Sequence, residues 1–240
     1  MTGIARLQSF YLAICALPML ASCQTVRVSP SGLDHNDKYI ARGNEPGWIV
    51  TIDTQNVVYE GDYGQTRITV PAPEGRPSFN GMRYVTDRLT IDITYSSCVD
   101  DMSGMRFADT VLVIADEKQF QGCGGRPLPP ESLKDTSWSI LTIGQAPVLG
   151  HITTEIRFAD GRVSGNVGCN RFSGPYSVSG NKVRIGNVAL TKMMCPENQA
   201  AQENQFLRLI KAPLTKRFTV EGHLILSDDN ANQVILKQTP

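Results

Sequence analysis

The sequence predicts a mainly β protein built from two small, antiparallel, β-barrel-like domains, the second carrying one α-helix. Three observations support this prediction. Short runs with alternating apolar and polar residues recur along the chain, only one segment has a convincing helical pattern, and a Gly/Pro-rich segment at 124–130 divides the two series of runs. The 240 residues, 41% of them hydrophobic, are enough to form one or two ordinary cores.

Residues 1–22 differ in character from the rest of the chain. Arg6 supplies a sparse positive start, and residues 10–21 form an apolar run that is shorter than the ~20 residues of a transmembrane helix. The run ends in Leu20-Ala21-Ser22-Cys23, which resembles the lipobox of bacterial lipoprotein precursors. This resemblance implies a signal peptide over residues 1–22 and a lipid on Cys23. An N-terminal core helix or an ordinary secretory signal is the alternative.

Residues 23–38 are expected to form a lipidated tether, because the stretch after Cys23 is polar and has no periodicity. Two or more acyl chains hold a protein stably at a membrane. In the sorting rule that the lipoprotein resemblance brings, Gln24 favours the outer membrane. In a host with two membranes, we therefore expect an outer-membrane lipoprotein that faces the periplasm.

The N-terminal module, residues 39–126, is predicted to contain only strands. Leu89, Ile91 and Ile93 alternate with polar residues, which is the period of a half-buried strand. The expected strands are 48–53, 56–60, 66–70, 88–95, 110–115 and 119–122.

The C-terminal module, residues 131–240, combines strands with one helix. Asp160-Gly161 predicts a type I′ hairpin turn, because both turn positions need positive φ. Pro196 is typical of a helix start and precedes the predicted helix over 197–211. The expected strands are 138–143, 155–159, 162–167, 174–178, 182–185, 188–191, 217–221, 223–227 and 233–237.

Four cysteines remain once Cys15 leaves with the signal peptide and Cys23 is lipidated, and export places these four where disulfides persist. Three pairings can be drawn. We favour Cys98–Cys123 and Cys169–Cys195, because the domain boundary then leaves one pair in each module. Closing a loop of about 25 residues restricts the unfolded chain by about 3–4 kcal/mol. A metal site or a catalytic thiol is disfavoured, because no tight C-x-x-C spacing and no Cys–His motif occurs.

Short motifs follow one another through the C-terminal module: Trp138, GRVSG at 161–165, GCNRF at 168–172, GPY at 174–176, TKMMC at 191–195 and ENQFL at 203–207. In this order they resemble the META-domain family, which is also known from a heat-inducible bacterial outer-membrane lipoprotein. The resemblance implies a compact, lipocalin-like β fold with one helix, and a role in the envelope or in stress. It brings no established chemistry.

Three motifs mark the N-terminal module: ARGNEPGW at 41–48, CVDDMSGM at 98–105 and QGCGG at 121–125. They resemble an uncharacterised module of bacterial lipoproteins that often precedes META, and they bring no established activity. Where that module commonly has Asp-Gly before Met-Ser-Gly, this chain has Asp100-Asp101. If the turn needs positive φ at the second position, Asp tolerates it less well than Gly.

The candidates for contact with a ligand or partner are Glu45, Trp48, Asp100, Asp101, Asn170 and Arg171. Glu45 and Trp48 lie in a segment that we interpret first as a tight turn delivering the indole into the core. Asp100 and Asp101 could together hold a cation, although exposed turn acids beside a disulfide are the favoured interpretation. Asn170 and Arg171 could form an anion nest, but a bend beside the disulfide is favoured.

Two further motifs are given ordinary structural interpretations. Met193-Met194 lacks a third soft ligand for copper, so we expect these side chains to fill the core. The segment 228–232 superficially resembles a calcium loop, but the later ligands of such a loop are missing, and we expect a hairpin turn.

Charge and motifs exclude several classes of function. The 23 basic residues balance 23 acidic ones and form no cluster, which argues against nucleic acid as a partner. Serine hydrolase, P-loop and dinucleotide motifs are absent from the sequence, so an enzyme is the least favoured hypothesis, and no catalytic residue, metal or cofactor is predicted.

We therefore expect a non-catalytic lipoprotein, a stress-related binding or structural module that contacts the membrane through its lipid and an unknown envelope protein. One alternative is an inhibitor of an exported cell-wall hydrolase that uses the loops 43–47 and 100–104. The other is a carrier of a small apolar ligand, which needs an enclosed cavity of about 300 Å³ or more.

Overall fold

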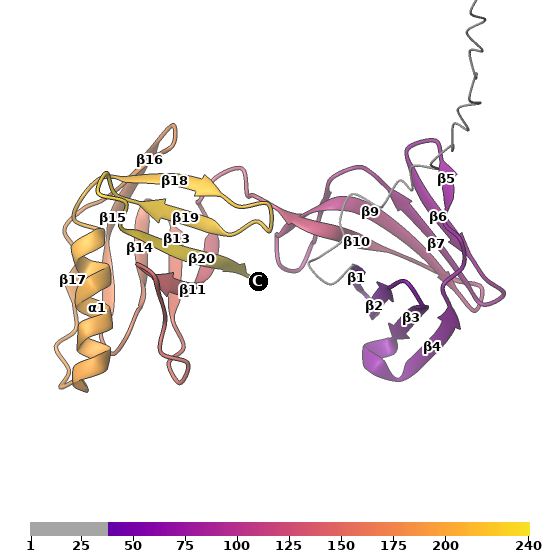
Figure 1. Ribbon diagram of the computed structural model, residues 1–240, viewed down its shortest axis with the longest axis horizontal. Coiled ribbons are helices and arrows are strands. Elements are labelled where there is room, and N and C mark those ends of the chain that lie inside the picture. The colour runs from indigo at the N-terminus through magenta and orange to yellow at the C-terminus, as the bar shows by residue number, and fades with distance from the viewer. Residues whose placement is uncertain (1–37) are drawn as a thin grey trace, which may run out of the picture.

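The computed structural model describes residues 38–240, and its strands form two antiparallel sheets with a single α-helix (Figure 1). The mainly β fold class is confirmed. The predicted signal peptide, the lipidation site Cys23 and the tether up to residue 37 lie outside the described residues. Over residues 38–240, no helix has the length and apolar character needed to cross a membrane.

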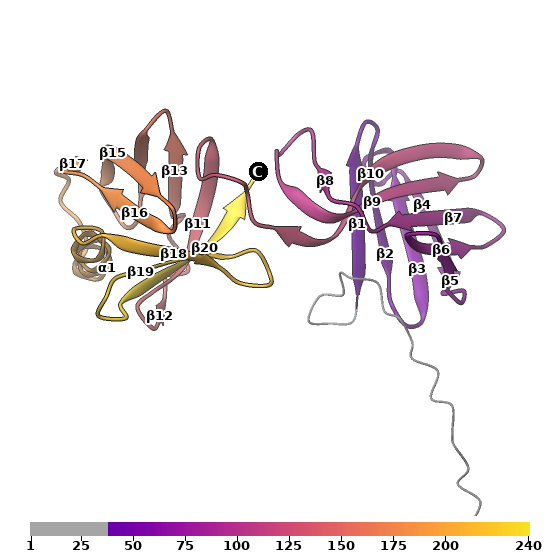
Figure 2. The same cartoon turned by 90° about the horizontal axis from the view of Figure 1, so that it is seen from above.

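The N-terminal sheet curls into a half-barrel whose edge strands are β4 and β5 (Figure 2). Its strand order is β4-β3-β2-β1-β10-β9-β7-β6-β5, with β8 paired to β9. A short 3-10 helix, η1 (Asp62–Gly64), connects β3 to β4. The strands are β1 (Tyr39–Asn44), β2 (Gly47–Ile52), β3 (Asn56–Gly61), β4 (Thr66–Pro71), β5 (Arg76–Ser78), β6 (Gly81–Val85), β7 (Leu89–Thr94), β8 (Cys98–Val99), β9 (Arg106–Ala115) and β10 (Lys118–Leu128).

Strand β9 shows how the alternating pattern builds this core, because every second residue from Phe107 to Ala115 is buried. Asp109 is the polar member of that buried series. It accepts a hydrogen bond of 3.1 Å from the Tyr39 hydroxyl. Burial, and after it the charge of Asp109, raises the pKa of Tyr39, so the hydroxyl stays protonated and remains a donor to the carboxylate.

Some N-terminal elements differ from the sequence prediction. The sequence does not predict β1, β5, β6 or β8. Gly, Asn or Pro weakens the local β signal in β1, β5 and β6, and β8 is only two residues long. Pairing with β2 and β10 on either side is what makes β1 a strand. Strand β10 also continues to Leu128, beyond residue 126 where the module was expected to end, with a register shift between Gly124 and Pro127.

The C-terminal sheet closes into an eight-stranded antiparallel barrel, because its first strand, β11, pairs with its last, β20. Strands β12 and β17 are short additions outside this ring. The strands are β11 (Thr136–Ile143), β12 (Ala146–Pro147), β13 (Glu155–Ala159), β14 (Arg162–Asn166), β15 (Arg171–Ser179), β16 (Lys182–Ile185), β17 (Ala189–Leu190), β18 (Leu214–Phe218), β19 (Leu224–Ser227) and β20 (Gln233–Thr239).

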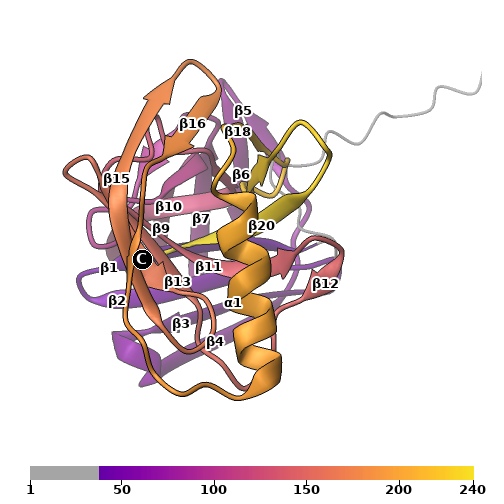
Figure 3. The ribbon, with the colours of Figure 1, turned by 90° about the vertical axis from the view of Figure 1, so that its left-hand side faces the viewer.

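The helix α1 (Glu197–Leu209) lies against the barrel, in front of its strands in the view of Figure 3. Its buried Phe206 ring lies 5.3 Å from the ring of Phe172, and Leu209 and Ile210 join the same core cluster. The apolar face of α1 therefore completes the barrel core. The helix ends at Leu209 instead of residue 211, and β18 begins at Leu214 instead of residue 217.

The two predicted hairpin turns are confirmed. Asp160 and Gly161 have φ values of 49° and 72°, and they connect Ala159 to its cross-strand partner Arg162. Asp228 accepts hydrogen bonds from backbone N–H groups of the turn between β19 and β20. In both places, local residue chemistry alone selects the turn.

Trp138 provides a test of the barrel core. Its side chain is fully buried, its Nε1 donates to the Thr136 hydroxyl at 2.8 Å, and its ring lies 6.3 Å from that of Phe218. We expect Trp138→Ala to lower the free energy of unfolding by about 3–5 kcal/mol. Val178→Ala, at an exposed strand position, is the control and should change it by about 0.5 kcal/mol. Denaturant titration with intact disulfides measures both, and equal losses would contradict this account of the core.

Candidate functional site

The three N-terminal sequence motifs, which lie far apart in the chain, meet around one hollow of about 680 Å³ in the half-barrel. Its lining comes from residues 42–45, 47, 98–102 and 121–123, together with Tyr63 and Thr110. Pairing of β1 with β10 sets residues 41 and 42 opposite residues 124 and 123, and this brings two of the motifs together. We call this feature the N-terminal hollow.

Gly43 and Gly122 line the N-terminal hollow at places where the backbone and the Trp48 indole approach each other closely. A Cβ atom on Gly122 would lie 2.1 Å from the carbonyl oxygen of Arg42, and one on Gly43 would lie 2.3 Å from Nε1 of Trp48. Trp48 itself is buried and packs in the core cluster. This agrees with the interpretation of the 43–48 motif as a turn that delivers the indole into the core.

A disulfide closes one side of the N-terminal hollow. Cys98 and Cys123 are bonded, with their Cα atoms 5.4 Å apart, and they connect β8 to β10. Cys169 and Cys195 form the second bond, with Cα atoms 5.9 Å apart. Both cysteine pairs predicted from the domain boundary are therefore confirmed. The first pair fixes the 98–104 segment against the sheet.

Asp100 is held rigidly at the edge of the N-terminal hollow. Its Oδ1 accepts hydrogen bonds from the backbone N–H of Met102 at 3.1 Å and from both the N–H and the hydroxyl of Ser103 at 2.8 Å. Its Oδ2 accepts one from Nδ2 of Asn44 at 3.3 Å. Burial by itself raises the pKa of Asp100, but the hydrogen bonds from Ser103, Asn44 and Met102 outweigh it and lower the pKa.

The expectation of exposed turn acids is wrong for Asp100, which is only 6% exposed, and correct for Asp101. The difference arises because the Asp100 side chain bonds back to its own turn. Asp101 stands where the related module commonly has Gly, and a positive φ would be unfavourable for it. In this turn the residue with positive φ is Gly104, at 67°. Asp101 therefore carries no strain from a left-handed backbone conformation.

Exposed apolar side chains surround the opening. Tyr63 is 79% exposed, Met102 is 84% exposed and Val99 is 56% exposed. The Tyr63 ring packs on Gly47, where an added Cβ would lie 2.9 Å from it. Tyr63 is not among the contact residues predicted from the sequence. The signal that could have identified it is an aromatic residue in a polar turn that ends in glycine.

Negative charge predominates in the N-terminal hollow. Glu45, Asp100 and Asp101 face one cation, Arg42, whose guanidinium carbon lies 5.8 Å from the centre of the Phe107 ring. Within residues 38–240, none of the three carboxylates forms an ion pair, and no group of three metal-ligating side chains occurs. The lining residues include no histidine and no free thiol. The charged side chains of the lining are therefore three carboxylates and one guanidinium.

Asn170, in the bend before β15, and Arg171, the first residue of β15, lie in the C-terminal module and do not line the N-terminal hollow. Asn170 donates from its N–H and its Nδ2 to the Glu203 carboxylate at 2.7 and 3.0 Å. Its Oδ1 accepts from the Thr191 hydroxyl at 3.0 Å and from the N–H of Met193 at 2.9 Å. Asn170 therefore connects the 191–195 loop to α1. This supports the bend beside the disulfide instead of an anion nest.

The prediction that Met193 and Met194 fill the core is wrong. Met193 is half exposed and Met194 is fully exposed. Because Asn170 holds the backbone of this loop against the barrel, both methionine side chains remain outside the core. Neither of them lines the N-terminal hollow.

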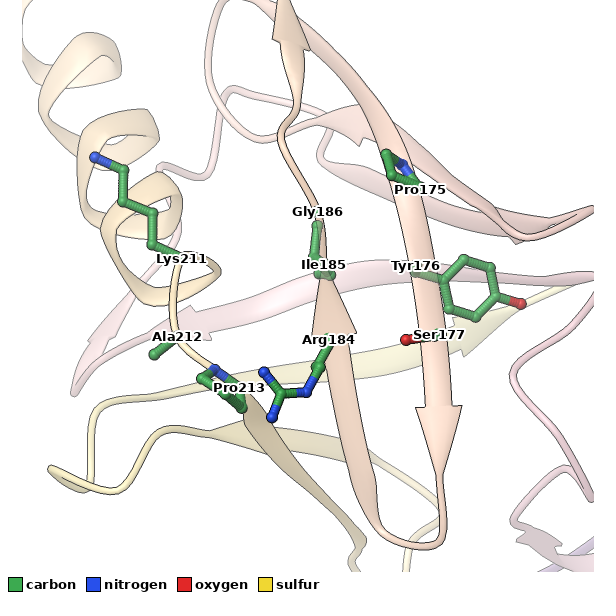
Figure 4. A pocket seen from close by; sticks show the side chains of 9 residues that line it. All are labelled: Pro175, Tyr176, Ser177, Arg184, Ile185, Gly186, Lys211, Ala212 and Pro213. Atoms are coloured by element: carbon green, nitrogen blue, oxygen red, sulfur yellow. The ribbon is translucent and has the colours of Figure 1, made fainter.

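A second hollow, of about 360 Å³, lies between β15, β16 and the segment after α1 (Figure 4). In that view, Arg184 reaches toward Pro213, and Tyr176 points away from them. None of the predicted contact residues lines this hollow. The N-terminal hollow, in contrast, is lined by three of the six predicted contact residues, Glu45, Asp100 and Asp101.

Comparison with known proteins identifies a known domain family in the C-terminal part of the chain. The model of the META domain matches residues 131–240, which confirms the predicted family of the C-terminal module. No curated protein matches the chain. An NMR structure of a protein from Burkholderia xenovorans is 21% identical, covers 45% of this chain and 83% of its own, and has a TM-score of 0.40. Another NMR structure is 25% identical, covers 46% and 94%, and has a TM-score of 0.39.

The lowered pKa of Asp100 predicts a pH dependence of stability. A carboxyl whose pKa falls on folding stabilises the protein above its ordinary pKa, and this contribution is lost as the pH falls through the folded-state pKa. We expect Asp100→Asn to lower the free energy of unfolding by about 1–3 kcal/mol near neutral pH. The reason is that the groups that donate hydrogen bonds to residue 100 would lose a charged acceptor. The cost should shrink below about pH 4.

Asp101→Asn is the matched control for this measurement, because the neighbouring side chain is exposed and holds none of these hydrogen bonds. It should change stability by about 0.5 kcal/mol. Denaturant titrations between about pH 3 and about pH 7 distinguish the two variants. A cost of Asp100→Asn that is the same at every pH would contradict the role of its charge.

Proposed function

Because residues 131–240 form a META domain, we propose that this chain is a non-catalytic binding module of the cell envelope. It binds a partner protein through the N-terminal hollow. The observation that carries the proposal is the hollow itself, a depression that is lined in part by glycines and has exposed apolar side chains at its edge. The stress-related role that the META resemblance implies is part of the same proposal.

The rim supports a protein contact. Tyr63, Met102 and Val99 expose apolar surface to water around one opening, and grouped exposure of this kind marks interaction sites more often than scattered single residues do. Tyrosine and methionine are also enriched where proteins bind one another. Covering these side chains would remove apolar area from water.

The surroundings of the N-terminal hollow are rigid, which reduces the cost of ordering a binding surface. The disulfide Cys98–Cys123, the strand pairs on either side of β10 and the four hydrogen bonds to Asp100 hold the lining in one arrangement. A surface that is already in its bound conformation loses less entropy when a partner arrives.

Lipidation at Cys23 is the proposed means of attachment. The lipobox-like residues 20–23 support it, and Gln24 supports an outer-membrane location in a host with two membranes. The polar tether that follows would let the described residues reach a partner at the membrane surface.

Inhibition of an exported cell-wall hydrolase is a second candidate function, and one observation favours it. Met102 stands exposed in the 100–104 loop, and that loop is fixed at its base by Asp100 and by the Cys98–Cys123 disulfide. Inhibitors that bind enzymes tightly commonly present such preorganised segments. The carrier alternative is disfavoured, because inward-facing side chains from the strands and α1 pack into one cluster in the barrel.

Replacing the acylated cysteine tests the anchor. We expect Cys23→Ala to move the protein from the membrane fraction to the soluble fraction, because the acyl chains can no longer be attached. Cys15→Ala is the matched control, since this residue would leave with the signal peptide, and the protein should stay with the membrane. Immunoblots of the two fractions measure both. Identical fractionation of the two variants would refute lipidation at position 23.

Photo-crosslinking in the native envelope tests the N-terminal hollow as the binding face. We expect p-benzoylphenylalanine in place of Met102 to yield one discrete crosslinked protein, because this position lies on the rim. The same replacement of Phe79, a fully exposed residue outside the hollow, is the control and should not yield that product. Gel electrophoresis and mass spectrometry identify the products. Lack of a discrete product at 102, or the same product at both positions, would count against the proposal.

A further inference from the structure

The geometry points to the kind of group that the N-terminal hollow receives: we propose that the partner protein inserts an arginine side chain from an exposed loop. This inference rests on the proposed function, since it names the chemistry of the partner at the same site. It follows from the charge of the lining, the hydrogen bonding of the buried Asp100 carboxylate and the exposed apolar side chains at the rim.

The lining carries an excess of negative charge. Glu45, Asp100 and Asp101 contribute three carboxylates, and no ion pair neutralises any of them in the part of the chain that the structure describes. The one cation of the lining, Arg42, lies over the ring of Phe107 instead. A positively charged group that enters the hollow would therefore meet complementary charge.

Asp100 is the carboxylate best prepared for a cation. It is nearly buried, yet all its hydrogen-bond donors are neutral groups, from Asn44, Met102 and Ser103. Three of these bonds end on Oδ1, whereas Oδ2 accepts only the 3.3 Å bond from Asn44 and keeps accepting capacity. A buried charge without a counter-ion is costly, and a partner's cation would offset that cost. Hydrogen bonds to a carboxylate are stronger when the donor is also charged.

The rim suits the rest of an arginine side chain. The exposed Tyr63 ring offers a face for a planar guanidinium. Met102 and Val99 offer apolar surface to the methylene stem, which long basic side chains bury while their charge stays in a polar environment. Lysine would share the charge, but it lacks the planar group that stacks and donates two parallel hydrogen bonds.

A divalent metal ion fits the site less well. Calcium requires six to eight oxygen ligands, whereas Oδ1 of Asp100 is already occupied by three donors. No set of three metal-ligating residues is found between residues 38 and 240. The volume of about 680 Å³ also accommodates the residues that flank an inserted side chain on a loop.

Titration with defined peptides tests the inference. The probe is the blocked peptide Ac-Ala-Gly-Arg-Gly-Ala-NH₂, added to the chain from residue 23 onward with Cys23→Ser, and followed by ¹H–¹⁵N NMR. We expect saturable shifts at the amides of Gly47, Tyr63 and Met102. The same peptide with lysine should bind at least about fivefold more weakly, and the peptide with neutral, isosteric citrulline should not bind.

Two substitutions in the lining test the role of charge. Glu45→Gln with Asp101→Asn should weaken the arginine peptide about tenfold, because two of the three carboxylates are neutralised. Arg67→Gln with Glu60→Gln removes an exposed ion pair between β3 and β4, outside the hollow, and is the matched control that should leave binding unchanged. Asp100 is left intact because its substitution also removes structural hydrogen bonds.

Several results would overturn the inference: equal affinity for the citrulline peptide, shifts confined to the C-terminal barrel, no binding of the arginine peptide, or the same shifts with Ca²⁺ alone. Crosslinking from position 102 separates the two proposals. If the protein with p-benzoylphenylalanine at position 102 forms the same crosslinked product with and without Glu45→Gln/Asp101→Asn, only the arginine inference fails. If it forms no product even with Glu45 and Asp101 intact, the proposed function fails.

Discussion

Backbone pairing of β10 with both of its neighbours is the constraint on which the N-terminal hollow depends. Strand β10 lies between β1 and β9, so the 121–125 motif is fixed against the 41–48 motif on one side. The disulfide from Cys123 to Cys98 then ties the third motif to the same strand. Glycine at positions 43 and 122 is required because the backbones and the Trp48 indole approach too closely for a Cβ atom. The hollow is thus a consequence of strand order and close packing.

Electrostatics and packing act together in this site. Asp100 is buried because its own turn supplies the hydrogen bonds that replace water, and these bonds keep it ionised. The loop that they fix also presents Met102 outward. One short segment therefore carries both a preorganised charge and an exposed apolar side chain, and both belong to the proposed binding surface. Asn170 in the C-terminal module has a different role. Its backbone N–H and side-chain amide form the hydrogen bonds that join α1 to the 191–195 loop.

Local chemistry was sufficient for some features and insufficient for others. The Asp160-Gly161 turn, the start of α1 and the strand pattern around Leu89 and Ile91 depend on neighbouring residues, and they were predicted correctly. Strand β1 could not be predicted, because its own Arg-Gly-Asn residues do not favour a strand. Its extended conformation comes from pairing with β2 and β10. The lack of a third soft ligand predicts a core position for Met193 and Met194, but the loop backbone directs both side chains outward.

The fold class, the cysteine pairs and the family of residues 131–240 could be predicted from the sequence, because they depend on periodicity, on spacing relative to a domain boundary and on motifs in a set order. Glu45, Asp100 and Asp101 could also be selected, but as members of separate motifs. That the three share one hollow with Tyr63, and that Asn170 and Arg171 do not, became visible in the folded structure. Strand order and sheet curvature set those distances, and both arise from pairings between residues far apart in the chain.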